Sequence, residues 1–271
     1  MNANSGAALG RPEHTDLPPE SAEGLPGADG PVRRVLRAEV QRARQRRAGA
    51  PVRVVDVGGG SGVWAVPMAA AGCTVTVVDS SPDALAALRG RAVRAGVADR
   101  VRAVQGDAQT LAEVVPAGGA DLVLGHGLLE IVDDIATVVI QLAEAVEPGG
   151  AVSVLVAARH AAALAHAHAG RLVQARTVLT DPAGRWGSGD PLQRRLDEAG
   201  LRGLLESAAG LSVEVVQGDG IFHGLLPASV TEAAPSEFES LEALVAGNPE
   251  FLVLAARLHV LARRPDRADW A

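Results

Sequence analysis

Short apolar runs alternate with longer amphipathic segments through the middle of this chain. The runs, each bounded by Gly, Pro or polar residues, predict strands at 53–57, 74–79, 102–105, 121–124 and 152–156. Apolar positions at helical spacing predict helices at 30–47, 64–71, about 82–95 and 134–146. Because strands and helices alternate, the pattern indicates a parallel sheet with helices on both faces.

The pattern changes after residue 157. We expect an Ala-rich helix at 159–174, a Gly- and Pro-rich loop at 181–191, helices at 192–199 and 237–246, and strands at 211–216 and 259–262. With these two strands, the chain is predicted to form an α/β fold with a doubly wound, mostly parallel seven-stranded sheet. We expect a disordered tail at 1–29 and one domain at 30–271, with a substrate-side insertion at about 159–200.

Composition narrows the classes of function. The formal net charge of the 271 residues is −7, which argues against a broad nucleic-acid-binding surface. Seven arginines between Arg33 and Arg47 are the local exception, and they form either a solvated helix face or a phosphate or RNA contact. The single cysteine, Cys73, excludes a disulfide, and we expect no metal site. No run is long enough to span a bilayer and no signal peptide is evident, so we expect a cytoplasmic protein.

A glycine-rich turn follows the first predicted strand. Gly58, Gly60 and Gly62 come directly after a buried run, and glycines let the backbone approach a ligand where a Cβ would collide. Asp79 closes the next strand, where its carboxylate can accept hydrogen bonds from both hydroxyls of a ribose. Strand, turn, helix, strand and carboxylate together indicate half of a nucleoside-binding fold.

The spacing of this turn restricts the nucleoside. A dinucleotide-binding turn has the pattern Gly-x-Gly-x-x-Gly, whereas Val63 stands where its last glycine would be. A phosphate-gripping loop needs a lysine, and the chain contains none. We therefore expect a ligand without a pyrophosphate. Asp56, just before the turn, is badly placed against an anion and suits a cationic amino-acid ligand.

Polar motifs also follow the third and fourth predicted strands. In Gly106-Asp107-Ala108-Gln109, the side chains of Asp107 and Gln109 can hydrogen-bond to the exocyclic amine and ring nitrogens of an adenine. Asp107 can alternatively be a plain turn residue. His126 follows the fourth strand, at the edge where ligands bind in open α/β sheets, and a packed core histidine is its alternative. With Pro148-Gly149-Gly150, these motifs make residues 50–157 resemble the class I S-adenosylmethionine-dependent methyltransferases, which implies S-adenosylmethionine as the cofactor.

A closer resemblance covers about residues 30–265. The chain is similar to the bacterial tRNA 5-carboxymethoxyuridine methyltransferase family. That family methylates the carboxylate of a modified wobble uridine. The similar segments are Gly30-Pro31-Val32-Arg33, Gly125-His126-Gly127-Leu128-Leu129-Glu130, Gly189-Asp190-Pro191, Leu196-Asp197-Glu198-Ala199-Gly200, Phe222-His223 and 259–265. The resemblance implies roles for Arg33 at the methionine carboxylate, Gly58 and Gly59 at the turn, Asp79 on the ribose, Ala108 and Gln109 at the adenine, and His126 near the reactive end. Our full set of expected cofactor-binding residues adds Asp56, Gly60, Gly62, Ser80 and Asp107.

The chain departs from that family where the family would hold RNA. A lysine-rich run is replaced by 169–177, which has only Arg171 and Arg176, and of the aromatic residues nearby mainly Trp186 remains. Fewer phosphate contacts mean weaker RNA binding. We therefore expect a methyltransferase acting on a small molecule or modified nucleoside. The alternatives are a tRNA wobble-uridine carboxyl methyltransferase and a non-catalytic S-adenosylmethionine-binding protein, and a dinucleotide-dependent oxidoreductase is disfavoured by the glycine spacing.

The catalytic residues stay open at this point. A carboxylate nucleophile needs no general base, whereas for a hydroxyl or amine His126, His160 or His223 could accept the proton. The sequence does not choose among the three, or among oxygen, nitrogen and carbon as the methylated atom. His160, His166 and His168 have no partners at metal-ligand spacing, so we expect them on the surface of a helix.

Overall fold

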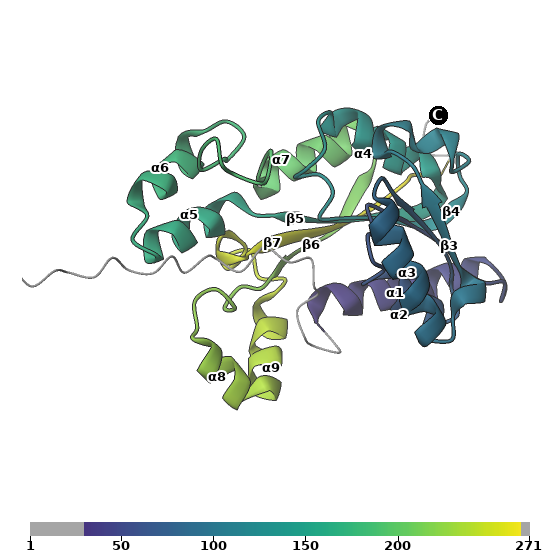
Figure 1. Ribbon diagram of the computed structural model, residues 1–271, viewed down its shortest axis with the longest axis horizontal. Coiled ribbons are helices and arrows are strands. Elements are labelled where there is room, and N and C mark those ends of the chain that lie inside the picture. Colours follow the sequence, from purple (N-terminus) through teal and green to yellow (C-terminus); the bar gives the residue numbers. More distant parts are fainter. Residues whose placement is uncertain (1–29, 267–271) are drawn as a thin grey trace, which may run out of the picture.

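A seven-stranded sheet forms the centre of the protein, for which a computed structural model describes residues 30–266 (Figure 1). The predicted tail at 1–29 lies outside these residues. The strand order is β3-β2-β1-β4-β5-β7-β6. The strands are β1 (Arg53–Val57), β2 (Thr74–Asp79), β3 (Val101–Gln105), β4 (Ala120–His126), β5 (Val146–Ala157), β6 (Ser212–Asp219) and β7 (Arg257–Arg263). The predicted doubly wound, mostly parallel α/β sheet is confirmed.

The strand pairing brings the ends of six strands to one edge of the sheet. β1 pairs in parallel with both β2 and β4, so the chain reverses its direction of winding between them. Ligands of open α/β sheets bind at such a switch point, outside the carboxyl ends of the strands. β7 is antiparallel, and its first residue, Arg257, therefore pairs with Ala157 and Asp219 at the ends of β5 and β6. All the strand-end residues singled out in the sequence lie on this edge.

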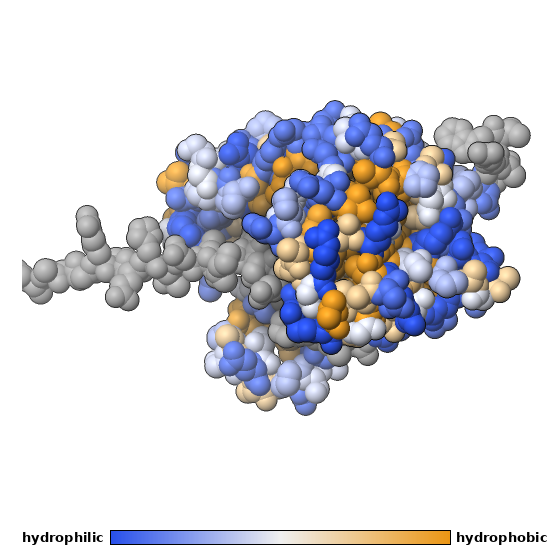
Figure 2. All heavy atoms as spheres, turned by 45° about the vertical axis from the view of Figure 1, so that its right-hand side comes forward, coloured by the Kyte–Doolittle hydropathy of each residue, from blue (hydrophilic) through white to orange (hydrophobic). Residues whose placement is uncertain are grey.

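Helices cover both faces of the sheet. α1 (Pro31–Arg46), α2 (Ala65–Ala70) and α3 (Pro82–Arg94) lie on one face, and α4 (Ile135–Ala145) and α7 (Glu198–Gly203) lie on the other (Figure 1). Leu36 of α1 and Leu88 of α3 belong to the first of two apolar cores, which we call the α1-side core. Charged and apolar side chains share the outer surface, as expected for helices with only one buried face (Figure 2). Within residues 30–266, no helix is long and apolar enough to cross a bilayer.

The segment between β5 and β6 differs from the prediction in two places. Instead of one helix at 159–174, the chain forms α5 (Arg159–His168) and α6 (Leu172–Thr180), which pack against each other. The break lies at Gly170, whose φ of 72° is incompatible with a continuing helix and easily adopted by glycine. The reversal also buries one of the histidines expected on the surface: His166 is only 5% exposed and its ring lies 6.0 Å from that of Trp186.

The predicted helix at 192–199 is wrong for most of its length. Residues 191–197 form an irregular segment, and α7 begins at Glu198, capped by Asp197, whose carboxylate accepts from the Gly200 amide. The cause is tertiary: the backbone amides of Gln193 and Arg194 donate to the Glu130 carbonyl, in the loop that follows β4. This segment therefore fixes the loop beside His126. A second connection, between β6 and β7, carries α8 (Ala228–Ala233), which the sequence did not predict, and α9 (Pro235–Val245).

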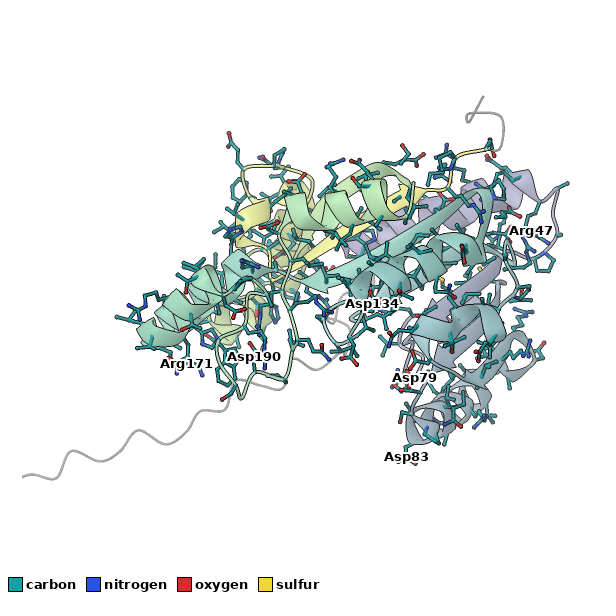
Figure 3. The ribbon with its side chains drawn as sticks, turned by 90° about the horizontal axis from the view of Figure 1, so that it is seen from above. Arg47, Asp79, Asp83, Asp134, Arg171 and Asp190 are labelled. Carbon is teal, nitrogen blue, oxygen red and sulfur yellow. The ribbon has the colours of Figure 1, made fainter. Side chains whose placement is uncertain are left out.

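The opposite edge of the sheet is held by a buried carboxylate. Asp121, with a side chain that is 0% exposed, accepts from the Arg53 backbone amide at 2.6 Å and from the guanidinium groups of Arg53 and Arg47. Burial alone would raise the pKa of Asp121, but hydrogen bonds from Arg53 outweigh it and hold the pKa below its usual value. Figure 3 shows Arg47 far from Asp79 and Asp134, which lie where the strands end.

Replacing this carboxylate tests its structural role. Asp121→Ala should reduce the free energy of unfolding by roughly 3 kcal/mol, because it leaves the β1 amide and two arginines without their shared acceptor. Asp99→Ala is the matched control. The ion pair between Asp99 and Arg100 is exposed and long, at 4.0 Å, so its loss should change stability by less than about 1 kcal/mol. Urea unfolding measures both variants, and equal effects would contradict the proposed role.

Candidate active site

The glycine turn after β1 is packed tightly on its inner side and open on its outer side. A Cβ on Gly59 would lie 2.5 Å from the Asp56 carboxylate and 2.9 Å from Cγ1 of Val77. A Cβ on Gly62 would lie 2.3 Å from Cδ1 of Leu88. At Gly60, by contrast, the nearest atom to a Cβ is the Asp79 carboxylate at 3.9 Å. The turn thus presents bare backbone next to a carboxylate, as a nucleoside site requires.

Asp79 joins this turn to the start of α3. One of its carboxylate oxygens accepts from the Gly60 amide at 2.9 Å and the other from the Ser81 amide at 2.8 Å. The helix cap itself is Ser81, whose hydroxyl accepts from the Ala84 amide. Each carboxylate oxygen can accept two hydrogen bonds, so capacity remains for the hydroxyls of a ribose. Ser80 is exposed beside it, and its carbonyl accepts from the Gln105 side chain.

Asp56 lies beneath the turn and is almost fully buried. It is 1% exposed, and its Oδ2 atom has no hydrogen-bond partner among the described residues. Burial, followed by the charge of Asp79, raises the pKa of Asp56 to about 7. A buried carboxylate of this kind is stabilised in its charged form by a cation. The carboxylates of Asp56 and Asp79 at the turn therefore fit a nucleoside that carries positive charge.

The motif after β3 lies beside these residues. The Gly106 amide donates to the Asp79 carbonyl at 3.2 Å, which joins the ends of β2 and β3. The Asp107 carboxylate accepts from the Gln109 amide at 2.8 Å and begins a short 3-10 helix, while Ala108 is buried. Asp107 thus has a turn-forming role in the structure, and its side chain remains exposed at the ligand edge.

His126 ends β4 and belongs to a stack of rings and charges. Its ring lies edge-on to Trp64 with the centroids 4.7 Å apart, and the Arg33 guanidinium lies 5.1 Å from the centre of the Trp64 ring. Nε2 of His126 is 2.8 Å from Oγ of Ser153. Burial, which has the largest effect, and the positive charge of Arg257 lower the pKa of His126 well below its usual value. His126 is therefore a neutral imidazole in this structure.

A pocket of about 270 Å³ opens beside this stack. It lies between the start of α1, the ends of β6 and β7, and the α8–α9 pair, and it is lined by Gly30, Pro31, Val32, Arg33, Trp64, Asp219, Gly220, His223, Thr231, Glu232, Pro235, Phe238, Glu239, Glu242 and Arg257. Trp64 and Phe238 supply its aromatic surface. Neither residue is among those predicted from the sequence, although for Trp64 the available signal was an aromatic residue two positions after Gly62.

The three histidines considered as proton acceptors lie in different surroundings. His223 is exposed at the pocket, with its ring 6.2 Å from that of Phe238. His160 is exposed on α5 and is not among the residues that line the pocket. His126 lies behind Trp64 with one ring nitrogen engaged by Ser153. The structure thus brings Arg33 and His223 to one pocket, His126 next to it, and His160 to a separate surface.

Comparison with known proteins adds the chemistry. The sequence model of a methyltransferase domain family matches residues 29–206. The chain is 28% identical over 219 residues to the tRNA 5-carboxymethoxyuridine methyltransferase of Escherichia coli (strain K12), covering 80% of this chain and 82% of that protein. It is 37% identical over 102 residues to the ubiquinone biosynthesis O-methyltransferase of Methylobacterium sp. (strain 4-46), covering 37% of this chain and 39% of that protein.

The fold comparison agrees with the sequence match. An S-adenosylmethionine-dependent methyltransferase from Mesorhizobium loti superimposes with a TM-score of 0.56 at 20% identity, over 88% of this chain and 100% of that chain. At this identity the likeness describes the fold, while the family match covers more than half of the sequence. The chain therefore belongs to the methyltransferase domain family and is an S-adenosylmethionine-dependent methyltransferase.

Proposed function

We propose that this methyltransferase acts on a small molecule or a modified nucleoside held in the pocket beside Trp64. The pocket itself is the observation that carries the proposal, since its volume of about 270 Å³ suits a small organic ligand better than a nucleic acid strand. Most of its exposed surface is apolar, and about half of its lining residues carry polar or charged groups that can orient a bound molecule. The partial likeness to a ubiquinone biosynthesis O-methyltransferase supports an acceptor of this kind.

The neighbouring turn suits the cofactor. We propose that the ribose of S-adenosylmethionine is held by Asp79, its adenine by residues 107–109, and its methionine end by Arg33 and the turn, with Asp56 beneath. The open backbone at Gly60 and the unpartnered Oδ2 of Asp56 support this arrangement. Ser80 and His126 complete the proposed set at its two ends.

The reaction requires little acid–base catalysis by the protein. When bound, S-adenosylmethionine supplies a methyl group already activated by its cationic sulfur. The chain's own residues then need to align the nucleophile and keep water out, which is an effect of orientation. The ionised Asp56 stabilises positive charge beneath the turn, and the rings of Trp64 and Phe238 hold the acceptor. If the acceptor is a hydroxyl or amine, His223 is the histidine that lines the pocket and can take its proton.

The tRNA alternative is favoured by the likeness to the tRNA-modifying enzyme. It is disfavoured by the contacts of the arginines in 33–47 and by the glutamates at the pocket. Most of the seven arginines from Arg33 to Arg47 are engaged, and for five of them the partner within the protein is identified. Arg33 lies over Trp64, and the others bond to carboxylates or a carbonyl: Arg42, Arg44, Arg46 and Arg47. Glu232 and Glu239 are exposed at the pocket, where they would repel an RNA backbone.

Cofactor binding at the turn is tested with S-adenosylhomocysteine. Asp79→Ala should weaken its binding by about 1.5–3 kcal/mol, the usual contribution of hydrogen bonds to a charged group. Asp83→Ala is the matched control, because Asp83 lies exposed in the first turn of α3 and its loss changes the charge equally. Calorimetric titration measures both variants, and NAD should not bind the parent protein. Unchanged affinity in Asp79→Ala, or binding of NAD alone, would overturn the assignment.

The raised pKa of Asp56 predicts a pH dependence. The native state keeps this proton up to about pH 7, whereas the unfolded chain loses it near the ordinary aspartate pKa of 3.8, so stability without ligand falls as pH rises between these values. Cofactor affinity moves the other way and should rise by up to about tenfold per pH unit below pH 7, because the cation favours the ionised carboxylate. Asp56→Asn should abolish both slopes. Titrations from pH 5.5 to 8.5 that are equally steep in the variant would contradict this role.

Salt dependence separates the two classes of substrate. We expect weak association with bulk tRNA at most, since the pocket is lined by four carboxylates and only two arginines. Binding through Z phosphates gives a slope of about −0.7Z to −0.9Z when the logarithm of the affinity is plotted against that of the salt concentration. Gel shifts at several salt concentrations measure it. Submicromolar binding at physiological salt, with a slope of several phosphates, would restore the tRNA alternative.

A further inference from the structure

A row of four polar side chains crosses the interior of the sheet, one from each of four neighbouring strands. Nε2 of His126 (β4) is 2.8 Å from Oγ of Ser153 (β5), which is 2.8 Å from Nε2 of His259 (β7). Nδ1 of His259 is in turn 2.9 Å from Nε2 of Gln217 (β6). Ser153 and His259 are 0% exposed and Gln217 is 7% exposed, so water does not compete for these bonds. The row is a continuous hydrogen-bonded chain that ends at the candidate active site.

All four side chains point to the same face of the sheet. Side chains alternate along a strand, and Leu124, Leu155 and Leu261, two residues from His126, Ser153 and His259, belong to the α1-side core. Trp64 packs against the same core and against His126. The row therefore contacts the pocket through Trp64, whose ring packs against His126 and lines the pocket.

With the Gln217 amide oriented so that its Nε2 faces His259, the direction of every bond in the row follows. The Gln217 Nε2 group can only donate, so Nδ1 of His259 accepts and its Nε2 carries the proton. That proton is donated to Ser153 Oγ, whose own hydroxyl proton is then donated to Nε2 of His126. A neutral imidazole has one donor and one acceptor, so the proton of His126 lies on Nδ1. Both rings are neutral, since burial lowers the pKa of His259 to about 3 and that of His126 well below its usual value.

We propose that this row is a positioning device that fixes His126 as the Nδ1–H tautomer and makes it a hydrogen-bond donor, not a base, in the methyltransferase site. Nδ1 of His126 is buried and has no hydrogen-bond partner among residues 30–266. A buried donor without a partner is costly, and its ligand is a carboxylate or carbonyl oxygen. The oxygen belongs either to the methionine end of the cofactor or to the acceptor molecule. This last step rests on the proposed function, whereas the tautomer does not.

The tautomer can be read directly. Nitrogen-15 NMR of the histidine rings at pH 7 should show His126 protonated on Nδ1 and His259 protonated on Nε2, both neutral. Ser153→Ala removes the donor to Nε2 of His126 and should shift His126 toward the Nε2–H tautomer while His259 keeps its own. Ser240→Ala, an exposed serine of α9, is the matched control and should change neither ring.

A second variant tests transmission along the whole row. Gln217→Glu, once ionised, can only accept, so every bond should reverse and His126 should become protonated on Nε2, three strands away. A charged or Nε2-protonated His126 in the parent protein would overturn the proposal, as would an Nδ1-protonated His126 in Ser153→Ala. Retention of the parent tautomer in Gln217→Glu at pH 9 would overturn the role of Gln217.

The same variants identify the source of the ligand oxygen. If the oxygen belongs to the cofactor, the affinity for S-adenosylhomocysteine in Ser153→Ala should fall about tenfold, and its binding to the parent should shift the Nδ1 resonance of His126. If it belongs to the acceptor, neither should change. The NMR measurement needs neither an acceptor nor turnover, so its failure would leave the proposed function intact. Failure of cofactor binding would in turn leave the tautomer assignment intact.

Discussion

The contact between the glycine turn after β1 and the carboxylate that ends β2 is the constraint on which the site depends. Asp79 accepts hydrogen bonds from the Gly60 and Ser81 amides, and it therefore fixes the turn and the start of α3 together. The turn can lie so close to β2 only because Gly59 has no side chain against Asp56 and Val77. The same packing buries Asp56, and burial raises its pKa. The proposed affinity for a cationic nucleoside is thus a consequence of how closely two strands and a turn pack.

The other half of the site is built by later parts of the chain. The segment before α7 bonds to the loop after β4 through the Glu130 carbonyl, and the connection between β6 and β7 supplies the pocket wall through His223 and Phe238. These segments leave the sheet at the edge where the glycine turn lies. In the proposed arrangement, the cofactor half depends on the order of the central strands and the acceptor half on the later connections, and we propose that these connections decide substrate choice.

The first five strands were predictable because their apolar runs and flanking glycines are local signals, and β1 and β2 match the predicted bounds. The segment after β5 was less predictable, because tertiary bonds of Gln193 and Arg194 override the local helical pattern. The glycine-turn residues and Asp79 could be proposed from spacing alone. The row from His126 to Gln217 could not, because Ser153 and His259 are 106 positions apart and meet only through strand register.

A structure of the complex with S-adenosylhomocysteine is the most direct test of where the cofactor binds. In that complex, we expect the ribose hydroxyls to lie within hydrogen-bond distance of the Asp79 carboxylate, the sugar to lie over Gly60, and the sulfur to face the pocket beside Trp64. Cofactor bound elsewhere on the sheet edge, or with its adenine in the pocket between α1 and α9, would contradict this expectation.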